Sequence, residues 1–238
     1  MIVLWAVIGV LIGSFAAIAG RALMDHPGGH TMTACDVCRR KKAWWELIPI
    51  FSYLGFGGRC RSCGTEIIVT DFVMELLGGA LLGIGAWRFT TTREFIWWAL
   101  FAVFTLLIFY IDVRWMVVPR SFAVITAFIT ILAQWSSGSM LMVALTAILG
   151  CTFYFFLYAI SRGKWVGDGD VGLGIIVGAA AATPTQLGLL LLLAHTAGAV
   201  VAGVLLKLGH KKIGDSLPMG LFLIPAAWVI VLYYGWLR

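Results

Sequence analysis

Charged side chains are scarce in this chain. Aspartate, glutamate, lysine and arginine together make up 12% of its 238 residues, whereas 61% of the residues are hydrophobic. A soluble domain could not cover its surface with so few charges. The composition therefore excludes a soluble globular protein and indicates an integral membrane protein. The net charge of +6 does not indicate nucleic-acid binding, because basic loops beside anionic lipid explain it equally well.

The first apolar segment, Met1 to Gly20, has no basic residue before it. A cleaved signal peptide begins with a positively charged region, so we expect this segment to remain as a membrane helix. The chain also lacks internal repeats and low-complexity segments.

Long apolar runs account for most of the sequence. About 20 apolar residues are needed to cross a hydrocarbon core of ~30 Å. Eight runs are candidates: 2–22, 68–87, 95–112, 117–135, 140–161, 170–184, 186–206 and 217–237. We therefore expect an all-α integral membrane protein with about eight transmembrane helices. Pro184 separates the short sixth run from the seventh.

The basic residues are distributed unevenly over the loops between these runs. Fourteen of the seventeen lie in the odd-numbered loops, and Arg88, Arg93 and Arg238 are the exceptions. The fourteen are Arg21, Arg39, Arg40, Lys41, Lys42, Arg59, Arg61, Arg114, Arg120, Arg162, Lys164, Lys207, Lys211 and Lys212. Because basic loops stay in the cytoplasm, the N-terminus is predicted to lie outside and every odd loop inside.

Two cysteine pairs lie in the long first loop. Cys35 and Cys38 form one CxxC pair, and Cys60 and Cys63 form the other after 21 intervening residues. Cytoplasmic thiols stay reduced, and this spacing is typical of a tetrahedral zinc site. Four protein ligands leave no open position, so the zinc would be structural. Four free thiols or a redox pair are the alternatives.

The loop that carries the cysteines, residues 25–66, is close to the size below which a segment needs a metal or disulfide to fold, about 40 residues. Gly57, Gly58 and Gly64 would supply the backbone freedom that the metal-binding turns require. The fifth cysteine, Cys151, lies in an apolar run and is interpreted as a small buried hydrophobic residue.

Acidic residues occur at two places where apolar runs meet the predicted cytoplasmic face. Asp112 ends the third run, and Gly167-Asp168-Gly169-Asp170 opens the sixth. Two carboxyl groups brought close together share a proton and can activate water, which is the chemistry of aspartyl proteases. The alternative is a local role, with Asp168 and Asp170 as helix caps and Asp112 as a partner of Arg114. His195, in the seventh run, is expected to be packed and hydrogen-bonded.

The combination of these motifs resembles the type IV prepilin peptidases, bifunctional leader peptidases and N-methyltransferases of pilus and type II secretion systems. Asp112 with Pro119 and the GxGD motif ending at Asp170 are similar to the two catalytic aspartate motifs of that family. Further similar stretches are Leu11-Ile12-Gly13-Ser14-Phe15, Glu46-Leu47-Ile48-Pro49-Ile50-Phe51-Ser52-Tyr53-Leu54, Gly58-Arg59-Cys60-Arg61-Ser62-Cys63-Gly64, Glu75-Leu76-Leu77 and Leu217-Pro218-Met219-Gly220.

The resemblance implies an inner-membrane enzyme that cleaves prepilins or pseudopilins with Asp112 and Asp170. It implies that S-adenosylmethionine then methylates the new N-terminus. Residues 1–24 would form the first helix, 25–66 a cytoplasmic zinc-ribbon-like loop associated with methylation, and 67–238 a seven-helix peptidase bundle. Supporting roles fall to Gly167, Gly169, Asp168, Glu75, Gly58 and Glu46. The sequence shows neither a soluble methyltransferase fold nor a glycine-rich cofactor loop.

The chain departs from the family pattern at four positions. Gly172 replaces a lysine and Arg120 an aspartate, while Met219 and Leu221 replace an aromatic residue and a proline. Lys164 or Arg120 would have to supply any cation that the missing lysine provides. Two other classes of function stay open: a cation-coupled transporter that uses the intramembrane acids, and a membrane scaffold of pilus assembly without catalysis.

Overall fold

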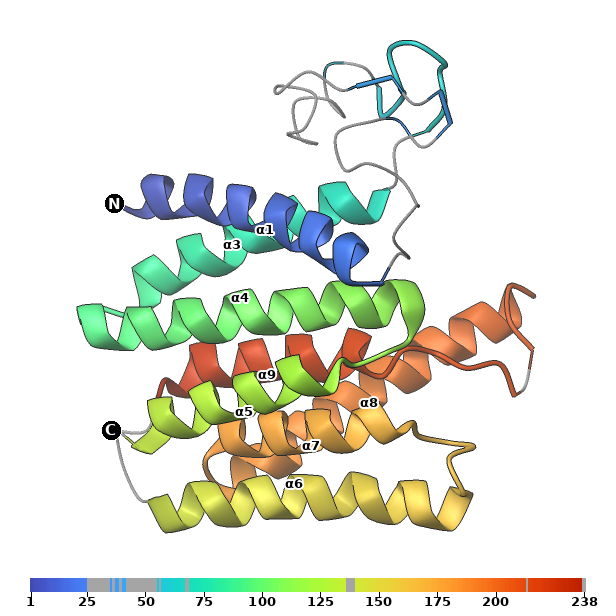
Figure 1. Ribbon diagram of the computed structural model, residues 1–238. Helices are drawn as coiled ribbons and strands as arrows, with labels where there is room; N and C mark the ends of the chain where they lie inside the picture. The colour runs from blue at the N-terminus through green and yellow to red at the C-terminus, as the bar shows by residue number, and fades with distance from the viewer. Residues whose placement is uncertain are drawn as a thin grey trace. The chain divides into compact units, whose positions relative to one another are not determined.

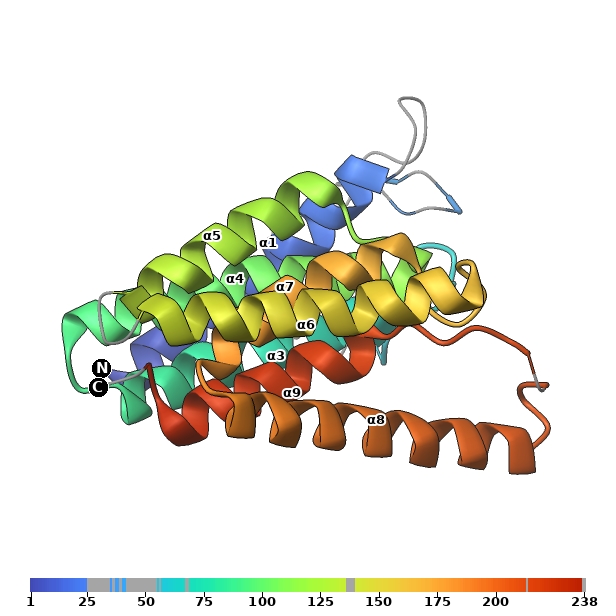
Figure 2. The ribbon, with the colours of Figure 1, turned by 90° about the horizontal axis from the view of Figure 1, so that it is seen from below.

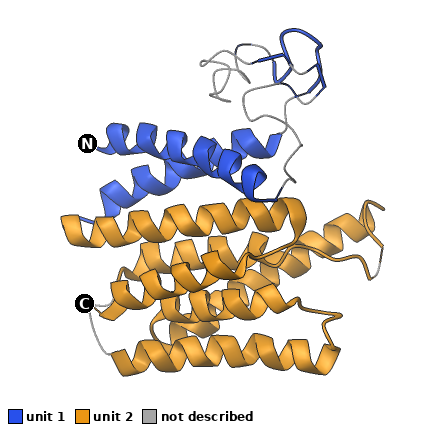
Figure 3. Cartoon of the chain, in the orientation of Figure 1, with its two compact units in different colours: residues 1–90 blue, residues 91–238 orange. Residues whose placement is uncertain are grey.

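A computed structural model describes residues 1–24, 35, 37–38, 40–41, 55, 57–66, 69–135, 140–212 and 214–236. These residues form eight α-helices, and the pairing between strands that occurs among them is one isolated bridge, Arg59 with Glu66. The predicted all-α class is confirmed (Figure 1). The chain divides into two compact units, Met1–Thr90 and Thr91–Arg238 (Figure 3).

The first unit contains two helices that pack closely, α1 (Ile2–Met24) and α3 (Val69–Arg88). Glycines form the contact, because a Cβ atom added at Gly9 or Gly13 would overlap the backbone of α3. Small residues let membrane helices approach in this way. An ion pair between Arg21 and Asp71 joins the same two helices.

The second unit contains six helices. They are α4 (Thr92–Trp115), α5 (Arg120–Trp135), α6 (Met140–Ser161), α7 (Asp168–Ala181), α8 (Pro184–Lys207) and α9 (Gly220–Tyr234). Successive helices run in opposite directions (Figures 1 and 2). The end of α4, the start of α7 and the start of α9 therefore lie at one end of this unit, together with the basic α4–α5, α6–α7 and α8–α9 connections.

Helix α7 is the central helix of the second unit, since it contacts α5, α6, α8 and α9. Glycines bring it against α6, because a Cβ atom at Gly174 would lie 2.5 Å from the Gly150 carbonyl oxygen. Helix α8, in contrast, is the least buried of the five long apolar helices.

The helices follow the predicted spans closely. Five of them, α1, α3, α4, α6 and α8, are long and apolar enough to cross a membrane, and α5 and α9 are shorter apolar helices. The multi-pass character of the chain is thereby supported. Pro184 begins α8, where Thr183 caps the helix by accepting a hydrogen bond from the Gln186 amide at 3.3 Å. Helix α4 continues one turn beyond Asp112, to Trp115.

Candidate active site and metal centre

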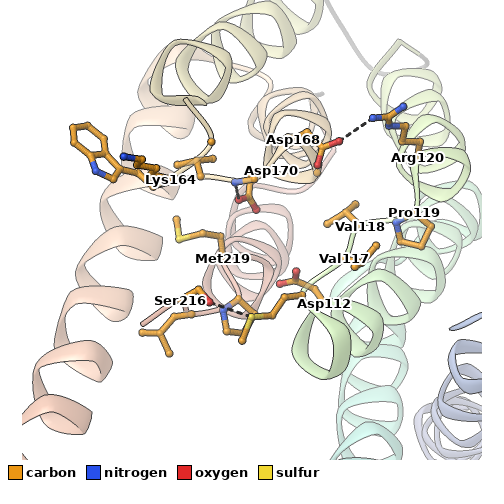
Figure 4. A pocket seen from close by; sticks show the side chains of 18 residues that line it. Asp112, Val117, Val118, Pro119, Arg120, Lys164, Asp168, Asp170, Ser216 and Met219 are labelled. Atoms are coloured by element: carbon orange, nitrogen blue, oxygen red, sulfur yellow. Dashed lines mark hydrogen bonds and ion pairs between the residues drawn. The ribbon is translucent and has the colours of Figure 1, made fainter. Parts of the chain in front are cut away.

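A pocket of about 510 Å³ lies at one end of the second unit. It is lined by Asp112 and by three chain segments at helix ends: 116–120, 163–170 and 216–219. Both predicted catalytic aspartates, Asp112 and Asp170, line it, and Figure 4 shows their carboxyl groups projecting into the same space from α4 and α7. The fold therefore brings together two carboxyl groups that are 58 positions apart in the sequence (170 − 112).

Asp112 is almost fully buried, with 3% of its surface exposed. Its Oδ2 accepts a hydrogen bond of 2.8 Å from the backbone amide of Gly220, the first residue of α9. This bond satisfies one of the amides that a helix N-terminus leaves without an intrahelical partner. A side chain at Gly220 would be excluded, since its Cβ would lie 2.6 Å from that oxygen. The guanidinium of Arg114, the alternative partner, lies over the Trp115 ring.

Asp170 is 9% exposed and lies in the first turn of α7. Its Oδ2 accepts a hydrogen bond of 3.0 Å from the amide of Gly167, the N-cap residue. The predicted capping role of Asp170 is thus present, and it does not compete with the pocket role, because the same side chain also lines the pocket. Each aspartate is held by a backbone amide, which fixes its position without adding a charged partner.

Gly169, the third residue of the GxGD motif, has a steric reason to be glycine. A Cβ atom there would lie 2.9 Å from the Cβ of Val118, in the α4–α5 connection. The connection that follows Asp112 is therefore packed directly against the turn that carries Asp170. Gly167 is less restricted, since its Cβ would make an ordinary 3.7 Å contact with Asp170.

Asp168 has a different environment from the two buried aspartates. Its carboxylate forms an ion pair of 2.9 Å with Arg120, and the two side chains are 66% and 89% exposed. Arg120, which stands where the resemblance leads one to expect aspartate, is therefore paired at the pocket rim (Figure 4). Lys164 also lines the pocket. At Gly172, where the family has lysine, a Cβ atom would come within 3.3 Å of the Ala123 Cβ.

The four paired cysteines come together in the first unit. Their sulfur atoms all lie within 4.8 Å of one another, and the five cysteines of the chain are free. Cys35 and Cys63 are 3.6 Å apart at sulfur, and Cys38 and Cys60 are 3.9 Å apart. A tetrahedron of thiolates at the usual Zn–S distance of ~2.3 Å has edges of about 3.8 Å. The cluster could therefore hold a metal ion of zinc's size, as predicted.

The turns around these cysteines use glycine as predicted. Gly57, Gly58 and Gly64 adopt φ values of 60°, 70° and 70°, which disfavour other residues. The Cys60 amide donates to the Thr65 carbonyl at 2.7 Å, and the Gly64 amide donates to the Cys60 carbonyl at 2.8 Å. These bonds close the tight turn that aims two sulfur atoms at one point.

The protonation of the cluster also suits a metal. Hydrogen bonds from the Thr65 hydroxyl and backbone lower the pKa of the Cys63 thiol to about 6. The pKa of Cys38 is raised to about 11: a backbone hydrogen bond at Arg40 opposes the rise, while desolvation and the neighbouring sulfur atoms cause it. Thiols this close cannot all ionise without a cation among them, and a divalent metal would remove that conflict.

The remaining predicted residues are distributed over both units. His195 is packed as predicted, because its Nδ1 lies 2.7 Å from the Leu191 carbonyl oxygen and its ring contacts Phe153 and Tyr154. Glu75 is fully buried in α3, and Gly58 is buried in the cysteine loop. Glu46 lies outside the described residues. Functional roles for these last three stay predictions.

Two residues of the site were not predicted from the sequence. Gly220 belongs to the stretch Leu217-Pro218-Met219-Gly220 that resembles the family, but nothing in that stretch indicates a link to Asp112. Val118 lies in the connection after Asp112, and nothing in its type marks it as the neighbour of Gly169. Both contacts join segments far apart in the chain, and local sequence patterns carry no signal for such contacts.

Comparisons with known proteins agree with the motifs. Residues 7–89 match the family described as bacterial peptidase A24 N-terminal domain. Three relatives carry the name prepilin leader peptidase/N-methyltransferase. The Pseudomonas aeruginosa protein is 28% identical over 212 residues, covering 84% of this chain and 71% of its own. The Bacillus subtilis protein is 29% identical over 180 residues, covering 72% and 70%. The Stutzerimonas stutzeri protein is 29% identical over 210 residues, covering 84% and 71%.

A search of solved structures finds no match for the chain. The sequence comparisons nevertheless cover both units, because several of the aligned relatives extend over more than four fifths of the chain. The resemblance indicated by the motifs is thus confirmed: over most of its length this chain is similar to the prepilin leader peptidase/N-methyltransferase family.

Proposed function

We propose that this chain is a membrane aspartyl endopeptidase that removes the leader peptide of type IV prepilins and related pseudopilins. The observation that carries the proposal is the convergence of Asp112 and Asp170 on one pocket, each held by a backbone amide. The name shared by the relatives supports the same reaction and the same class of substrate.

The reaction uses the two carboxyl groups as one acid–base pair. Two carboxyl groups that face each other in one pocket can share a proton, with one ionised while the other is protonated. The ionised carboxylate takes a proton from water, whose oxygen attacks the carbonyl carbon of the residue before the mature N-terminus. The protonated carboxyl then gives its proton to the leaving nitrogen as the C–N bond breaks. The products are the leader's carboxylate and a free amine.

We place this chemistry at the cytoplasmic face of the inner membrane. The pocket shares one end of the second unit with the basic connections, which the positive-inside rule assigns to the cytoplasm. A prepilin with its apolar helix in the bilayer would present its leader at that face. Water reaches a pocket at helix ends more easily than one at the centre of a bundle.

The cysteine cluster would hold a structural zinc ion through Cys35, Cys38, Cys60 and Cys63. With four thiolate ligands the ion has no position for water, so its role is to fold the loop. Methylation of the new amine would use S-adenosylmethionine, whose sulfonium supplies the methyl group. The residues 25–66, including Glu46 and Gly58, are the proposed location of that step.

Mass spectrometry of a candidate prepilin co-expressed with this protein tests the proposal. We expect the wild type to remove the leader and add the mass of one methyl group. Asp112→Asn and Asp170→Asn should each abolish cleavage. Asp215→Asn is the matched control, because this exposed carboxylate accepts a bond from the Lys212 amide outside the pocket and should be dispensable.

Three outcomes would count against the proposal. Cleavage by either Asn variant would overturn the aspartyl pair. Failure of the folded wild type to cleave any of several prepilins would favour a scaffold, and cation flux through reconstituted protein that requires Asp112 and Asp170 would favour a transporter.

A further inference from the structure

Tyr154, on α6, carries the one hydroxyl group that is buried and lacks a hydrogen-bond partner among the described residues. The residue is 0% exposed, and its Oη has no hydrogen-bond partner in the part of the chain that the structure describes. Burying a hydroxyl without a partner destabilises a fold by about 1–3 kcal/mol, so such a group calls for an explanation. A buried water molecule is the usual partner of an otherwise unsatisfied group in a protein interior.

The Tyr154 ring packs on the same face of α7 as Asp170. A Cβ atom at Gly174 would lie 2.9 Å from Cδ2 of Tyr154, so the ring rests on a glycine. Gly174 follows Asp170 by four residues, and residues at this spacing lie one above the other on a helix. Tyr154 also interacts electrostatically with Asp170. The phenol ring therefore packs against α7 about one helical turn from the second aspartate.

The other face of the ring is fixed by α8. The His195 ring stacks on Tyr154 with centroids 6.1 Å apart and planes 16° apart. Nδ1 of His195 lies 2.7 Å from the Leu191 carbonyl oxygen, which can only accept, so Nδ1 carries the proton. The histidine cannot swing away without losing this bond. Tyr154 is thus held between α7 and α8, with its hydroxyl in a defined place.

Asp170 has an oxygen available for such a neighbour. The hydrogen bond that the structure records for this side chain, from the Gly167 amide, goes to Oδ2. A carboxylate has two oxygens that can each accept hydrogen bonds. Oδ1 can therefore accept a bond from a water molecule that bridges to Tyr154.

We propose that Tyr154 is a positioning residue for Asp170, acting through a water molecule bound between its hydroxyl and the carboxyl group. The tyrosine hydroxyl donates to the water, and the water donates to Oδ1 of Asp170. This inference rests on the proposed peptidase function. It adds Tyr154 to the residues that support the active site, a role that neither the motifs nor the relatives' names assign. It also explains why this position holds a tyrosine, although a phenylalanine would pack equally well.

The bridge has a defined effect on the pH dependence of cleavage. The charged or titratable groups on α6 and on the helices that contact it are Cys151 and Tyr158 on α6, Arg120 on α5, Asp168 and Asp170 on α7, and His195 and Lys207 on α8. Arg120 is paired with Asp168, and Asp112 of α4 lines the same pocket as Asp170. A donated hydrogen bond favours the ionised carboxylate. Removing the bridge should therefore move the limb of the pH–rate profile that reports Asp170 to higher pH.

Tyr154→Phe tests the bridge, because it removes the hydroxyl and keeps the ring. We expect kcat for prepilin cleavage to fall about tenfold with KM unchanged, and one limb of the pH–rate profile to move to higher pH. The melting temperature should change little, since the ring keeps its packing and the bond to the water is what is lost. Tyr233→Phe is the matched control; this tyrosine, 75% exposed near the end of α9, should leave rate and profile unchanged.

An unchanged kcat and pH profile in Tyr154→Phe would overturn the inference. If that variant does not fold, incorporation of 3-fluorotyrosine at position 154 tests the water bridge instead, because it keeps the ring and makes the hydroxyl a stronger hydrogen-bond donor. It should move the same limb to lower pH, and no movement would overturn the inference. Failure of the wild type to cleave would instead reject the peptidase proposal, so the two failures are distinguishable.

Discussion

Glycine controls the positions of both aspartates at the scale of single residues. Gly220 donates its amide to Asp112, and Gly169 lets the turn before Asp170 pack on Val118. In each case a Cβ atom would come closer than atoms tolerate. These two glycines are therefore required by close approach rather than by unusual backbone angles.

The variant Gly220→Ala should reduce cleavage strongly without unfolding the protein. Its Cβ would lie 2.6 Å from Oδ2 of Asp112 and must displace that carboxyl group. A displacement of about 1 Å in an active site can reduce the rate about 100-fold. The measurement is the initial rate of prepilin cleavage in detergent. Gly203→Ala is the control, because no atom lies within 4 Å of a Cβ there. Equal rates for the two variants would contradict this account of the site.

The pocket rim carries an ion pair whose signs are reversed relative to the family pattern. The resemblance leads one to expect an aspartate at the position of Arg120 and a lysine at that of Gly172, whereas here Arg120 pairs with Asp168, one turn before Gly172. Ala123 is likewise one turn after Arg120 and is the neighbour of Gly172. This α5–α7 contact therefore carries a charge pair formed by Arg120 and Asp168.

Arg120→Ala should change stability by less than about 1 kcal/mol, because ion pairs between exposed side chains contribute little. Both partners are largely exposed, and salt screens them further. Thermal melting of the purified protein at low and high salt measures the effect. A loss of several degrees that persists at high salt would show that Arg120 has a buried structural role instead.

At the scale of elements, the contact between α1 and α3 depends on helix positions without side chains. Gly13→Leu should separate these helices and destabilise the first unit by about 1–3 kcal/mol, since it places a large side chain against the α3 backbone. Leu11→Ala on the exposed face of α1 is the control. Differential scanning calorimetry in detergent would detect the shift. Equal melting of the two variants would mean that the glycine contact is not needed.

The cysteine loop is an element whose fold should depend on its metal. We expect one zinc ion per chain by mass spectrometry of the metal content, and none after Cys60→Ser. Cys151→Ser should keep the zinc, because Cys151 lies in α6 and outside the cluster. Removal of the metal with a chelator should make the loop sensitive to protease while the helices remain. An intact cluster without metal, or a disulfide, would contradict the assignment.

Most of the helices could be predicted from the lengths of the apolar runs. The features that could not be predicted depend on contacts between helices that are distant in the sequence. The end of α4 was placed at Asp112, yet the helix continues to Trp115 and ends where Met116 adopts a left-handed conformation. A charged residue looks like the end of an apolar run, although a buried pocket can hold it inside the helix. Tyr154 was likewise unmarked, because within Phe153-Tyr154-Phe155-Phe156 it resembles any apolar aromatic residue.

At the scale of the whole molecule, the distribution of charge predicts how the chain crosses the membrane. The predicted eight spans with an external N-terminus would place the end of α9 outside as well. A C-terminal green fluorescent protein should therefore stay dark, whereas a C-terminal alkaline phosphatase should be active. The same reporters inserted after Lys211 should behave in the opposite way. A fluorescent C-terminal fusion would reverse the proposed orientation.

The hydrogen bond between Asp112 and Gly220 joins residues 108 positions apart. The ribosome makes Asp112 well before the helix whose amide holds it. A nascent chain that lacks α9 has one pocket segment, 216–219, still unanchored and its first carboxyl group without its backbone donor. Cleavage activity would therefore appear only after α9 has entered the membrane.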